Sequence, residues 1–304
     1  MLHRIKGNRV LAVSFSALAA TLLVGCDSSS SSGSDSDSGS LSLSVTDAPI
    51  DGADNVFVEF TAVEFKPADG SSITFTFDEA KSIDLLAQQG GNSAPLITDE
   101  DVPAGDYNWV RLAVNAEHDT VMDSYIVIGG DEHELEVPSG SQSGLKLNSG
   151  FTVPEGGSAS FTIDFDLRHS IVEANGEYKL KPVLRLIDNS GAATITGSID
   201  SSTVIASKCD DASLFAGAVY IFTGHDIAPD DIDENSPNPI ATAAVKLNEG
   251  ATAYEYTAAF LSAGDYTVTY TCDSDEADVD ETLEFEEAVN VTLTEGETET
   301  VDFQ

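Results

Sequence analysis

Apolar and polar residues alternate with a period of two along most of this chain beyond residue 40. Successive side chains of a β-strand point to opposite faces of a sheet, so such a run buries one face and exposes the other. Turn residues separate the runs at intervals of about 8–12 residues, which is typical of sandwiches and barrels. The sequence therefore predicts an all-β protein with two tandem antiparallel β-sandwich domains. The runs that support this prediction are 41–45, 56–60, 63–65, 73–77, 109–114, 125–128, 161–165 and 178–186.

Two features interrupt the strand pattern. Residues 83–89 favour one helical turn, which Gly90 and Gly91 would end. Pro182 has no N–H to donate within a sheet, so we expect it at a strand edge or a β-bulge.

The first 25 residues have the layout of a bacterial lipoprotein signal peptide. Arg4, Lys6 and Arg9 make a basic start without an acidic residue, and residues 10–23 form an apolar segment. This segment is shorter than the roughly 20 apolar residues that a transmembrane helix needs. It leads through Leu-Val-Gly into Cys26. We predict cleavage before Cys26 and lipidation of its thiol, since each buried acyl methylene contributes about 0.8 kcal/mol to membrane anchoring.

Residues 26–40 are predicted to be the lipidated cysteine and a flexible tether. Residues 28–40 are Ser, Gly and Asp only, so no apolar burial would offset the entropy of ordering them. The folded domains would stand off a membrane to which the lipid anchors them. The favoured location is the outer membrane or cell surface, and the periplasmic face of the inner membrane is the alternative.

The chain is strongly acidic. It has 53 acidic and 13 basic residues, a formal charge of −40, and removal of residues 1–25 takes away three cations and no anion, leaving −43. Such a charge repels nucleic acid and anionic lipid headgroups, so we expect no nucleic-acid partner. It attracts cations, although the simpler interpretation of the acids is solubility.

We place the boundary between the two domains at residue 191, so that the first is 41–190 and the second, prealbumin-like and more acidic, is 191–304. Residues 41–190 have eight basic and 26 acidic residues, whereas residues 191–304 have two basic and 24 acidic ones. Residues 104–107 and 263–266 both read Ala-Gly-Asp-Tyr at the start of a predicted strand. The tyrosine ring would pack at the core edge with its hydroxyl on backbone. This repeat favours a common architecture, and generic turns are the alternative.

Cys209 and Cys272 are the two cysteines other than Cys26. In an oxidising compartment a single pair is most simply one disulfide, so we predict a bond between them. No cysteine or histidine spacing suggests zinc.

Several segments together resemble domain-of-unknown-function family 4382, which occurs in bacterial lipoproteins. The resemblance covers roughly residues 41–188 and implies an extracytoplasmic β-domain without a known activity. The second domain is more loosely similar to transthyretin-like, carboxypeptidase-regulatory-like sandwiches. The segments that carry the first resemblance are 43–49, 58–66, 83–86, 103–107, 138–147, 163–168 and 178–182.

No motif predicts a catalytic site. Ser143 and Lys146 have the Ser-x-x-Lys spacing of serine acyl-enzymes, but they enter a predicted strand, where residues three apart point to opposite faces. His133 lies among acids on an alternating run, and we interpret it as part of a solvated strand face rather than a metal ligand. His225 lacks a second ligand at a useful spacing.

Two acidic loops of the second domain are the best candidates for a ligand site. Residues 230–235 and 273–281 carry closely spaced oxygen-bearing side chains, and calcium takes six to eight hard oxygen ligands from flexible loops. Solvated acidic loops without a metal are the alternative interpretation. The candidate calcium ligands are Asp231, Asp233, Asp273 and Asp275.

A weaker acidic cluster consists of Asp47, Asp51 and Asp54. Asp47 directly precedes Ala-Pro, so we interpret its side chain as turn-forming.

The function favoured by these features is that of a membrane-anchored, non-enzymatic binding or structural module of the cell envelope. Its partner would be an envelope protein, a glycan or a mineral cation. The alternative is an accessory subunit or a hydrolase whose catalytic residues are scattered in the sequence. A hydrolase would show a deep pocket with carboxylates of perturbed pKa.

Overall fold

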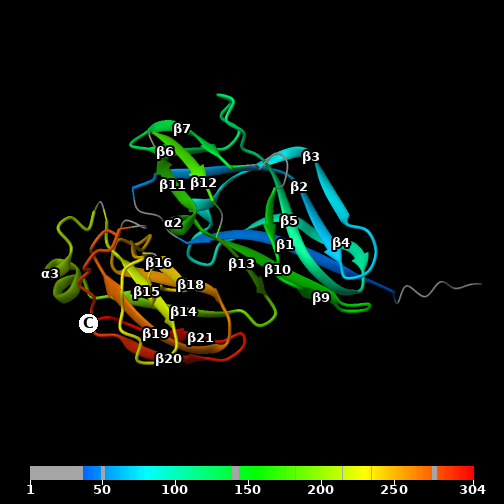
Figure 1. Cartoon of the computed structure of the whole chain (residues 1–304). Helices are drawn as coiled ribbons and strands as arrows, with labels where there is room; N and C mark the ends of the chain where they lie inside the picture. The colour runs from blue at the N-terminus through cyan, green and yellow to red at the C-terminus, as the bar shows by residue number, and fades with distance from the viewer. Residues whose placement is uncertain are drawn as a thin grey trace, which may run out of the picture. The chain divides into compact units, whose positions relative to one another are not determined.

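Strands form where the alternation predicts them (Figure 1). The computed structural model describes residues 37–48, 52–138, 144–174, 176–181, 183–213, 215–233, 235–275 and 279–304. The predictions for Cys26, Asp51, Ser143 and Pro182 lie outside these residues. Within them the chain forms four β-sheets and a few short helical turns, none of them long and apolar enough to cross a membrane.

The first sandwich, residues 38–188, has two sheets that share one hydrophobic core. The smaller sheet contains β13 (Leu184–Asp188), β10 (Ser158–Asp166), β1 (Ser38–Ala48) and β4 (Ala94–Pro103), in that order. The larger sheet contains β11 (Ile171–Ala174), β12 (Glu177–Leu180), β7 (Asp131–Glu136), β6 (Tyr125–Ile128), β2 (Asn55–Pro67), β5 (Gly105–Asn115) and β8 (Leu145–Leu147), with β3 (Ile73–Asp84) beside β2 and β9 (Phe151–Val153) beside β5.

Alternation explains how these strands build the core. Leu41, Leu43 and Val45 of β1 are buried while the serines between them are half-buried. β2 repeats the pattern, with Val56, Val58 and other apolar side chains turned toward the core. The predicted helical turn is η2 (Leu85–Gln88), and Asp84 caps it by accepting a hydrogen bond from the Leu86 N–H. Gly90 and Gly91, both at positive φ, follow it as expected.

The second sandwich, residues 193–303, also has two sheets around a core of its own. One sheet contains β17 (Lys246–Leu247), β18 (Tyr254–Leu261), β14 (Ala193–Ile199) and β21 (Thr298–Thr300). The other contains β16 (Ala241–Ala244), β15 (Ala218–Thr223), β19 (Gly264–Thr271) and β20 (Val289–Leu293). Two helical segments, η3 (Ser201–Ile205) and α3 (Ala206–Lys208), follow β14, and Asp200 caps the first of them.

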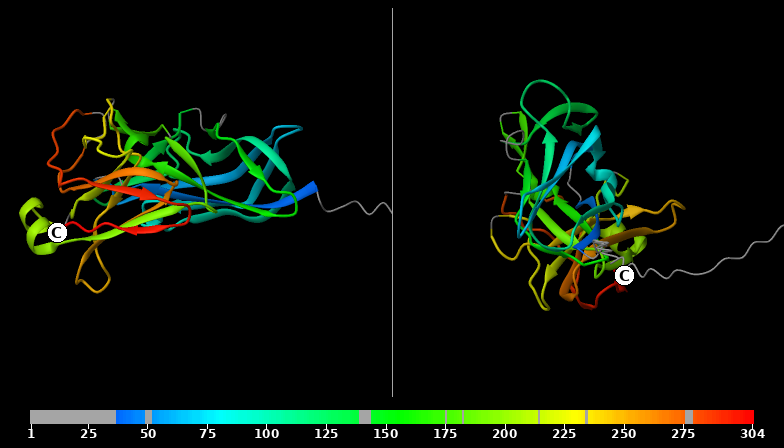
Figure 2. Two further views of the ribbon diagram at one scale, coloured as in Figure 1. Left: turned by 90° about the horizontal axis from the view of Figure 1, so that it is seen from below. Right: turned by 90° about the vertical axis from the view of Figure 1, so that its right-hand side faces the viewer.

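The first strands of the two sandwiches have matching neighbours, although the complete strand orders differ. In each, the first strand lies between an antiparallel neighbour, β4 or β18, and a parallel one, β10 or β21. Figures 1 and 2 show the blue β1 running beside the green β10. The Ala-Gly-Asp-Tyr strands also match, since β5 pairs with β9 and β19 pairs with β20 in the same register. The common architecture predicted from the repeat is therefore present.

The tyrosines of the repeat play the same role in both cores. The Tyr107 hydroxyl donates to the Pro103 carbonyl over 2.8 Å, and the Tyr266 hydroxyl donates to the Ser262 carbonyl over 2.8 Å. Both rings are buried. Each hydroxyl thus satisfies a carbonyl four residues earlier, in the manner of a tyrosine corner.

Two details differ from the sequence predictions. The parallel pairing of β1 with β10 and of β14 with β21 departs from a purely antiparallel arrangement. The run at 178–186 was expected to continue as one strand, but it splits into β12 and β13, which belong to different sheets. The alternation of apolar and polar residues predicts which side chains are buried, but it does not predict which strands pair with each other.

Candidate cation-binding site

Strand β15 explains why the two acidic loops meet. Its residues Ala218–Phe222 are all buried, because Val219 and Ile221 face the inner core and Tyr220 and Phe222 face outward. The outward side chains need a cover, and the loops before β16 and before β20 supply it. Ile232 from the first loop, and Leu283 and Phe285 from the second, pack against this outer cluster. Apolar residues placed among the acids therefore draw the loops together.

Three carboxylates come together where the loops meet. One oxygen each of Asp231, Asp233 and Asp280 lie within 4.8 Å of one another. Asp231 is 1% exposed, and its Oδ2 accepts a hydrogen bond from the Glu281 N–H of the other loop. Burial, reinforced by neighbouring Asp231, raises the pKa of Asp230. The site thus combines a buried, an intermediate and an exposed carboxylate in a region of strong negative charge.

Side-chain turns position Asp233 in this group. Asp233 Oδ1 accepts from the Asn235 N–H over 2.7 Å, and the Asp233 N–H donates to Asn238 Oδ1 over 3.1 Å. These bonds hold the loop so that Asp233 lies near Asp231.

Asp275 has a different place from the one predicted for it. It is 4% exposed and lies in an interior network in which Arg168 Nη1 donates to the Tyr220 hydroxyl and Tyr220 donates to Asp275 Oδ2, both over 2.6 Å. The Ile232 N–H donates to the same carboxylate oxygen over 3.1 Å, and Arg168 Nη1 lies 3.7 Å from it. Burial raises the pKa of Asp275, although these donors and Arg168 oppose the shift.

This network ties the two sandwiches together. Arg168 belongs to α2 (Leu167–Ser170) of the first sandwich, whereas Tyr220 and Asp275 belong to the second. Asp275 thus belongs to an interior hydrogen-bond network rather than to the loop surface. Asp273 is not a member of the cluster either. Its Oδ2 accepts a hydrogen bond from the Glu284 N–H over 2.6 Å.

Sequence reasoning therefore located the two loops and two members of the cluster, Asp231 and Asp233. It did not single out Asp280, although that residue lies in the acidic run 273–281. The missing signal is which part of the second loop meets the first. That contact depends on the apolar anchors Ile232, Leu283 and Phe285, and the spacing of the acids does not reveal it.

The disulfide between Cys209 and Cys272 is present, with Cα atoms 5.3 Å apart. It joins the residue after α3 to the residue after β19, where the second acidic loop begins. In the chain-entropy description such a cross-link stabilises a fold by about 4 kcal/mol. The bond fixes one end of the acidic loop.

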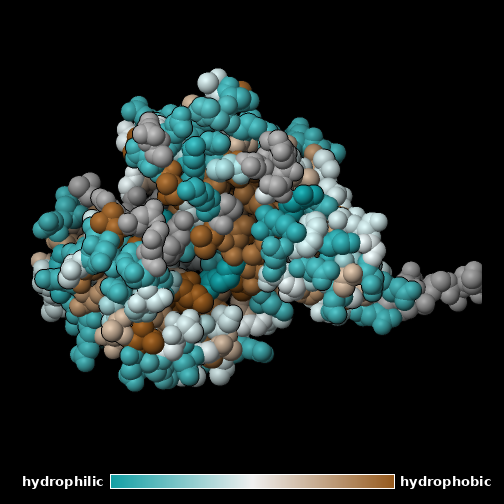
Figure 3. Space-filling view, viewed as in Figure 1, coloured by the Kyte–Doolittle hydropathy of each residue, from teal (hydrophilic) through white to brown (hydrophobic). Residues whose placement is uncertain are grey.

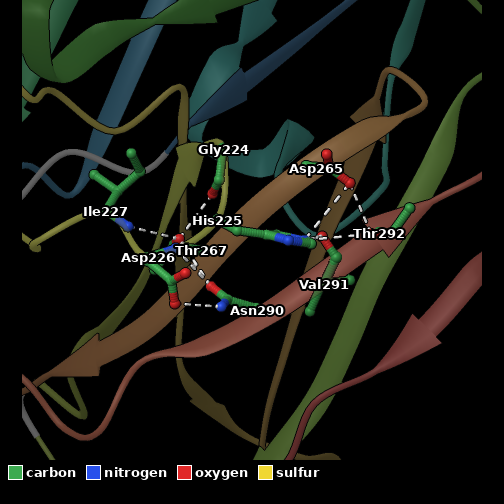
Figure 4. Close-up of polar contacts among 9 residues, drawn as sticks. All are labelled: Gly224, His225, Asp226, Ile227, Asp265, Thr267, Asn290, Val291 and Thr292. Atoms are coloured by element: carbon green, nitrogen blue, oxygen red, sulfur yellow. Dashed lines mark hydrogen bonds and ion pairs between the residues drawn. The ribbon is translucent and has the colours of Figure 1, made fainter.

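His225 does not form a catalytic relay with its neighbours. His225 Nε2 lies 3.2 Å from the Thr292 hydroxyl and 3.5 Å from Asp265 Oδ1 (Figure 4). Nucleophilic catalysis needs the hydroxyl and the acid on opposite ring nitrogens, and here both meet the same one. Asp226 and Asn290 complete a ladder that holds the turn after β15 to β20. His225 is therefore part of a structural polar network.

Two further histidines lie on the surface of the first sandwich, His133 in β7 and His118 in the loop between β5 and β6. His133 of β7 packs its ring against Tyr178, with ring centres 5.1 Å apart, and His118 Nδ1 lies 3.3 Å from Glu134. Figure 3 shows hydrophilic residues over the outer parts of this face of the molecule and hydrophobic residues toward its middle. These positions fit the interpretation of His133 as part of a strand surface.

Comparison with known proteins identifies the first sandwich. Residues 38–182 match the family described as Domain of unknown function (DUF4382). A DUF4382 domain is thus present in this chain, in agreement with the resemblance seen in the sequence. No curated protein matches the chain.

Solved structures show only distant similarity. A leucine-rich repeat protein from Bacteroides thetaiotaomicron is 12% identical, with a TM-score of 0.25, over 88% of this chain and 26% of the other. The minor pilin GBS52 of Streptococcus agalactiae is 11% identical, with a TM-score of 0.20, over 86% and 94% of the two chains. A cell adhesion protein from Parabacteroides distasonis is 10% identical, with a TM-score of 0.24, over 83% and 84%. Similarity at this level assigns no activity.

Proposed function

We propose that this protein is a lipid-anchored, extracytoplasmic binding module of the bacterial envelope that acts without catalysis, and that calcium binds between its two acidic loops. The observation that carries the proposal is the convergence of Asp231, Asp233 and Asp280. They lie in a sandwich whose basic residues are Lys208 and Lys246 alone. Three carboxylates can supply up to six oxygens, and backbone carbonyls or water can complete the coordination of calcium.

The extracytoplasmic location is supported by independent features. The disulfide suits an oxidising compartment. The basic start, the apolar segment and Cys26 suit lipidation. The Ser, Gly and Asp composition of residues 28–37 suits a spacer, whereas residues 38–40 of the predicted tether belong to β1. An envelope protein or glycan is the expected partner of a module held in this way.

The absence of catalysis is proposed because the described candidates have structural contacts. His225 and His133 belong to surface networks, and Lys146 lies in β8, where it contacts the Trp109 ring. One feature favours the hydrolase alternative, namely a cavity lined by Asp47 and Asp164. The Asp164 carboxylate is bonded to Arg185 over 2.6 Å, so these two acids do not form a free acid–base pair.

Thermal melting of the soluble mature protein, made with Cys26→Ser, tests the calcium proposal. Bound calcium would relieve the self-repulsion of the loops and stabilise the fold by about 2.7 kcal/mol at a hundredfold excess over Kd. We expect millimolar calcium to raise the Tm by several degrees beyond sodium chloride of equal ionic strength. The sodium chloride sample measures how much of the Tm increase comes from screening of the carboxylate charges, because screening depends only on ionic strength.

Two double variants test whether the calcium-dependent increase in Tm arises at the acidic loops. Asp231→Asn with Asp280→Asn should abolish the difference between the two salts. The matched control is Asp69→Asn with Glu79→Gln, which removes two exposed acids of the first sandwich and should leave it unchanged. Equal Tm values in calcium and sodium for the parent protein would show that the acidic loops are solvated surface.

A further inference from the structure

Asp47 is a buried carboxylate whose hydrogen bonds are missing. The sequence suggested a turn-forming side chain, but Asp47 is the penultimate residue of β1 and is 6% exposed. Neither of its oxygens has a hydrogen-bond partner of normal geometry, although the Gln89 side chain and the Leu167 backbone lie near enough to lower its pKa. Burying an unpaired carboxylate is costly, so such a group requires an explanation.

The neighbouring charges increase this cost. Burial raises the pKa of Asp47 well above its usual range, and the carboxylates of Asp164 and Asp166 raise it further. Two cations also line the cavity, but Arg185 Nη2 is bonded to Asp164 Oδ2 over 2.6 Å and Lys246 Nζ donates to Gln89 Oε1 over 3.0 Å. Among the described residues, none supplies Asp47 with a positive partner.

Asp47 lines a cavity of about 320 Å³. That volume equals roughly ten water molecules and reaches the lower end of ligand pockets. The first sandwich contributes Asp47 and the loop after η2, and the second contributes residues 241–244 and 257–260 of β16, β18 and their flanks. The wall is mixed, with aliphatic side chains such as Ala87, Ala244 and Ala259 beside polar ones such as Gln89, Asn92 and Thr242. A carboxylate in a cavity that offers both aliphatic contacts and hydrogen-bond acceptors matches an ammonium group on a short alkyl chain.

Both walls are held in place. The Thr46 hydroxyl lies 2.7 and 2.8 Å from the carbonyl oxygens of Gln88 and Asn92, which fixes the loop after η2 against β1. On the other side, β18 bulges opposite Ala193–Ile195, and Phe260 has a φ of 59°. A bulky residue at positive φ is strained, and such strain concentrates at ligand sites. The cavity is therefore preorganised, which lowers the entropic cost of binding.

We propose that this cavity binds a small organic cation, a primary ammonium group on a short aliphatic chain, with Asp47 as its counter-ion. A metal ion fits less well. Among the described residues, the one set of three acidic, histidine or cysteine ligands within metal-binding distance is Asp231, Asp233 and Asp280, and Asp47 is not in it. An ammonium group needs one carboxylate and a few hydrogen-bond acceptors, whereas calcium needs six or more oxygens.

Titration calorimetry with n-pentylamine on the soluble mature protein tests this site. The amine should bind, and 1-pentanol, which has the same chain without the charge, should not. Asp47→Asn should weaken amine binding at least about tenfold, a loss of about 1.4 kcal/mol. Ala244→Leu, which fills the cavity and keeps the charge, should weaken it as well. Asp69→Asn is the matched control and should bind like the parent.

Three results would overturn the proposal. They are no amine binding by the folded parent protein, equal binding by Asp47→Asn, and equal affinity for 1-pentanol. Calcium binding that is lost in Asp47→Asn but kept in Asp231→Asn would instead make the cavity a metal site. Since Asp47 and the acidic loops are separate groups of residues, the amine result and the calcium melting result can fail independently.

Discussion

At the scale of single residues, two buried aspartates differ in what surrounds them. Asp275 receives hydrogen bonds from Tyr220 and Ile232 and faces Arg168, whereas the oxygens of Asp47 have no bond of normal geometry. Asparagine substitutions should therefore act in opposite directions. Asp275→Asn removes the anion facing a buried guanidinium and should lower the free energy of unfolding by about 3 kcal/mol. Asp47→Asn should raise it at neutral pH, and urea unfolding measures both.

The pH dependence of Asp47→Asn checks the cause. The pKa of Asp47 is raised in the folded state, so the folded protein holds the Asp47 proton more tightly than the unfolded chain does. Asp47 therefore lowers the free energy of unfolding as pH rises above the unfolded pKa of about 3.9. The advantage of Asp47→Asn should thus be full above the folded pKa and shrink as pH falls toward 4. An advantage that is independent of pH would assign the effect to packing rather than to charge.

The same two residues show the limit of sequence reasoning at this scale. The acidic loops could be recognised from composition, but Asp275 was chosen as a ligand and Asp280 was not. Asp47 was interpreted as turn-forming although it is a strand residue. In each case the role depends on burial by segments distant in sequence, such as α2 for Asp275 and residues 241–244 for Asp47. The spacing of the acidic residues along the chain does not predict these long-range contacts.

At the scale of elements, alternation predicted the existence of strands well and their pairing poorly. Residues 125–128 form β6 as expected, and 41–45 lie inside β1. The parallel pairing of β1 with β10 brings together residues far apart in sequence, such as Ser40 and Ser158, which are 118 positions apart. Local periodicity does not encode contacts over such a separation. The repeated Ala-Gly-Asp-Tyr segment was more informative about pairing, because its tyrosine occupies the equivalent position at the start of β5 and β19.

The tyrosine hydrogen bonds yield a prediction for these elements. Tyr107→Phe and Tyr266→Phe each remove one buried hydroxyl bond and should each lower the free energy of unfolding by about 1 kcal/mol. Because the rings lie in separate cores, the two losses should add in the double variant. Tyr125→Phe, a half-buried ring stacked on Phe57, is the control and should change stability by less than about 0.5 kcal/mol. A double variant no less stable than either single one would show that the corners are not independent.

At the scale of the whole molecule, the proposed lipid is the feature that would hold an otherwise repelled protein at a membrane. Residues 26–304, the chain that the proposed cleavage would leave, have a formal charge of −43, so anionic headgroups would oppose their approach. Acyl chains on Cys26 would overcome this repulsion through buried methylenes, each worth about 0.8 kcal/mol. Cys26→Ser should therefore move the protein from the membrane fraction to the soluble fraction and abolish labelling by a fatty-acid probe. Cys209→Ser with Cys272→Ser removes the disulfide and should leave membrane association intact, which separates anchoring from folding. If Cys26→Ser stayed with the membranes, a contact other than the lipid would hold the protein there.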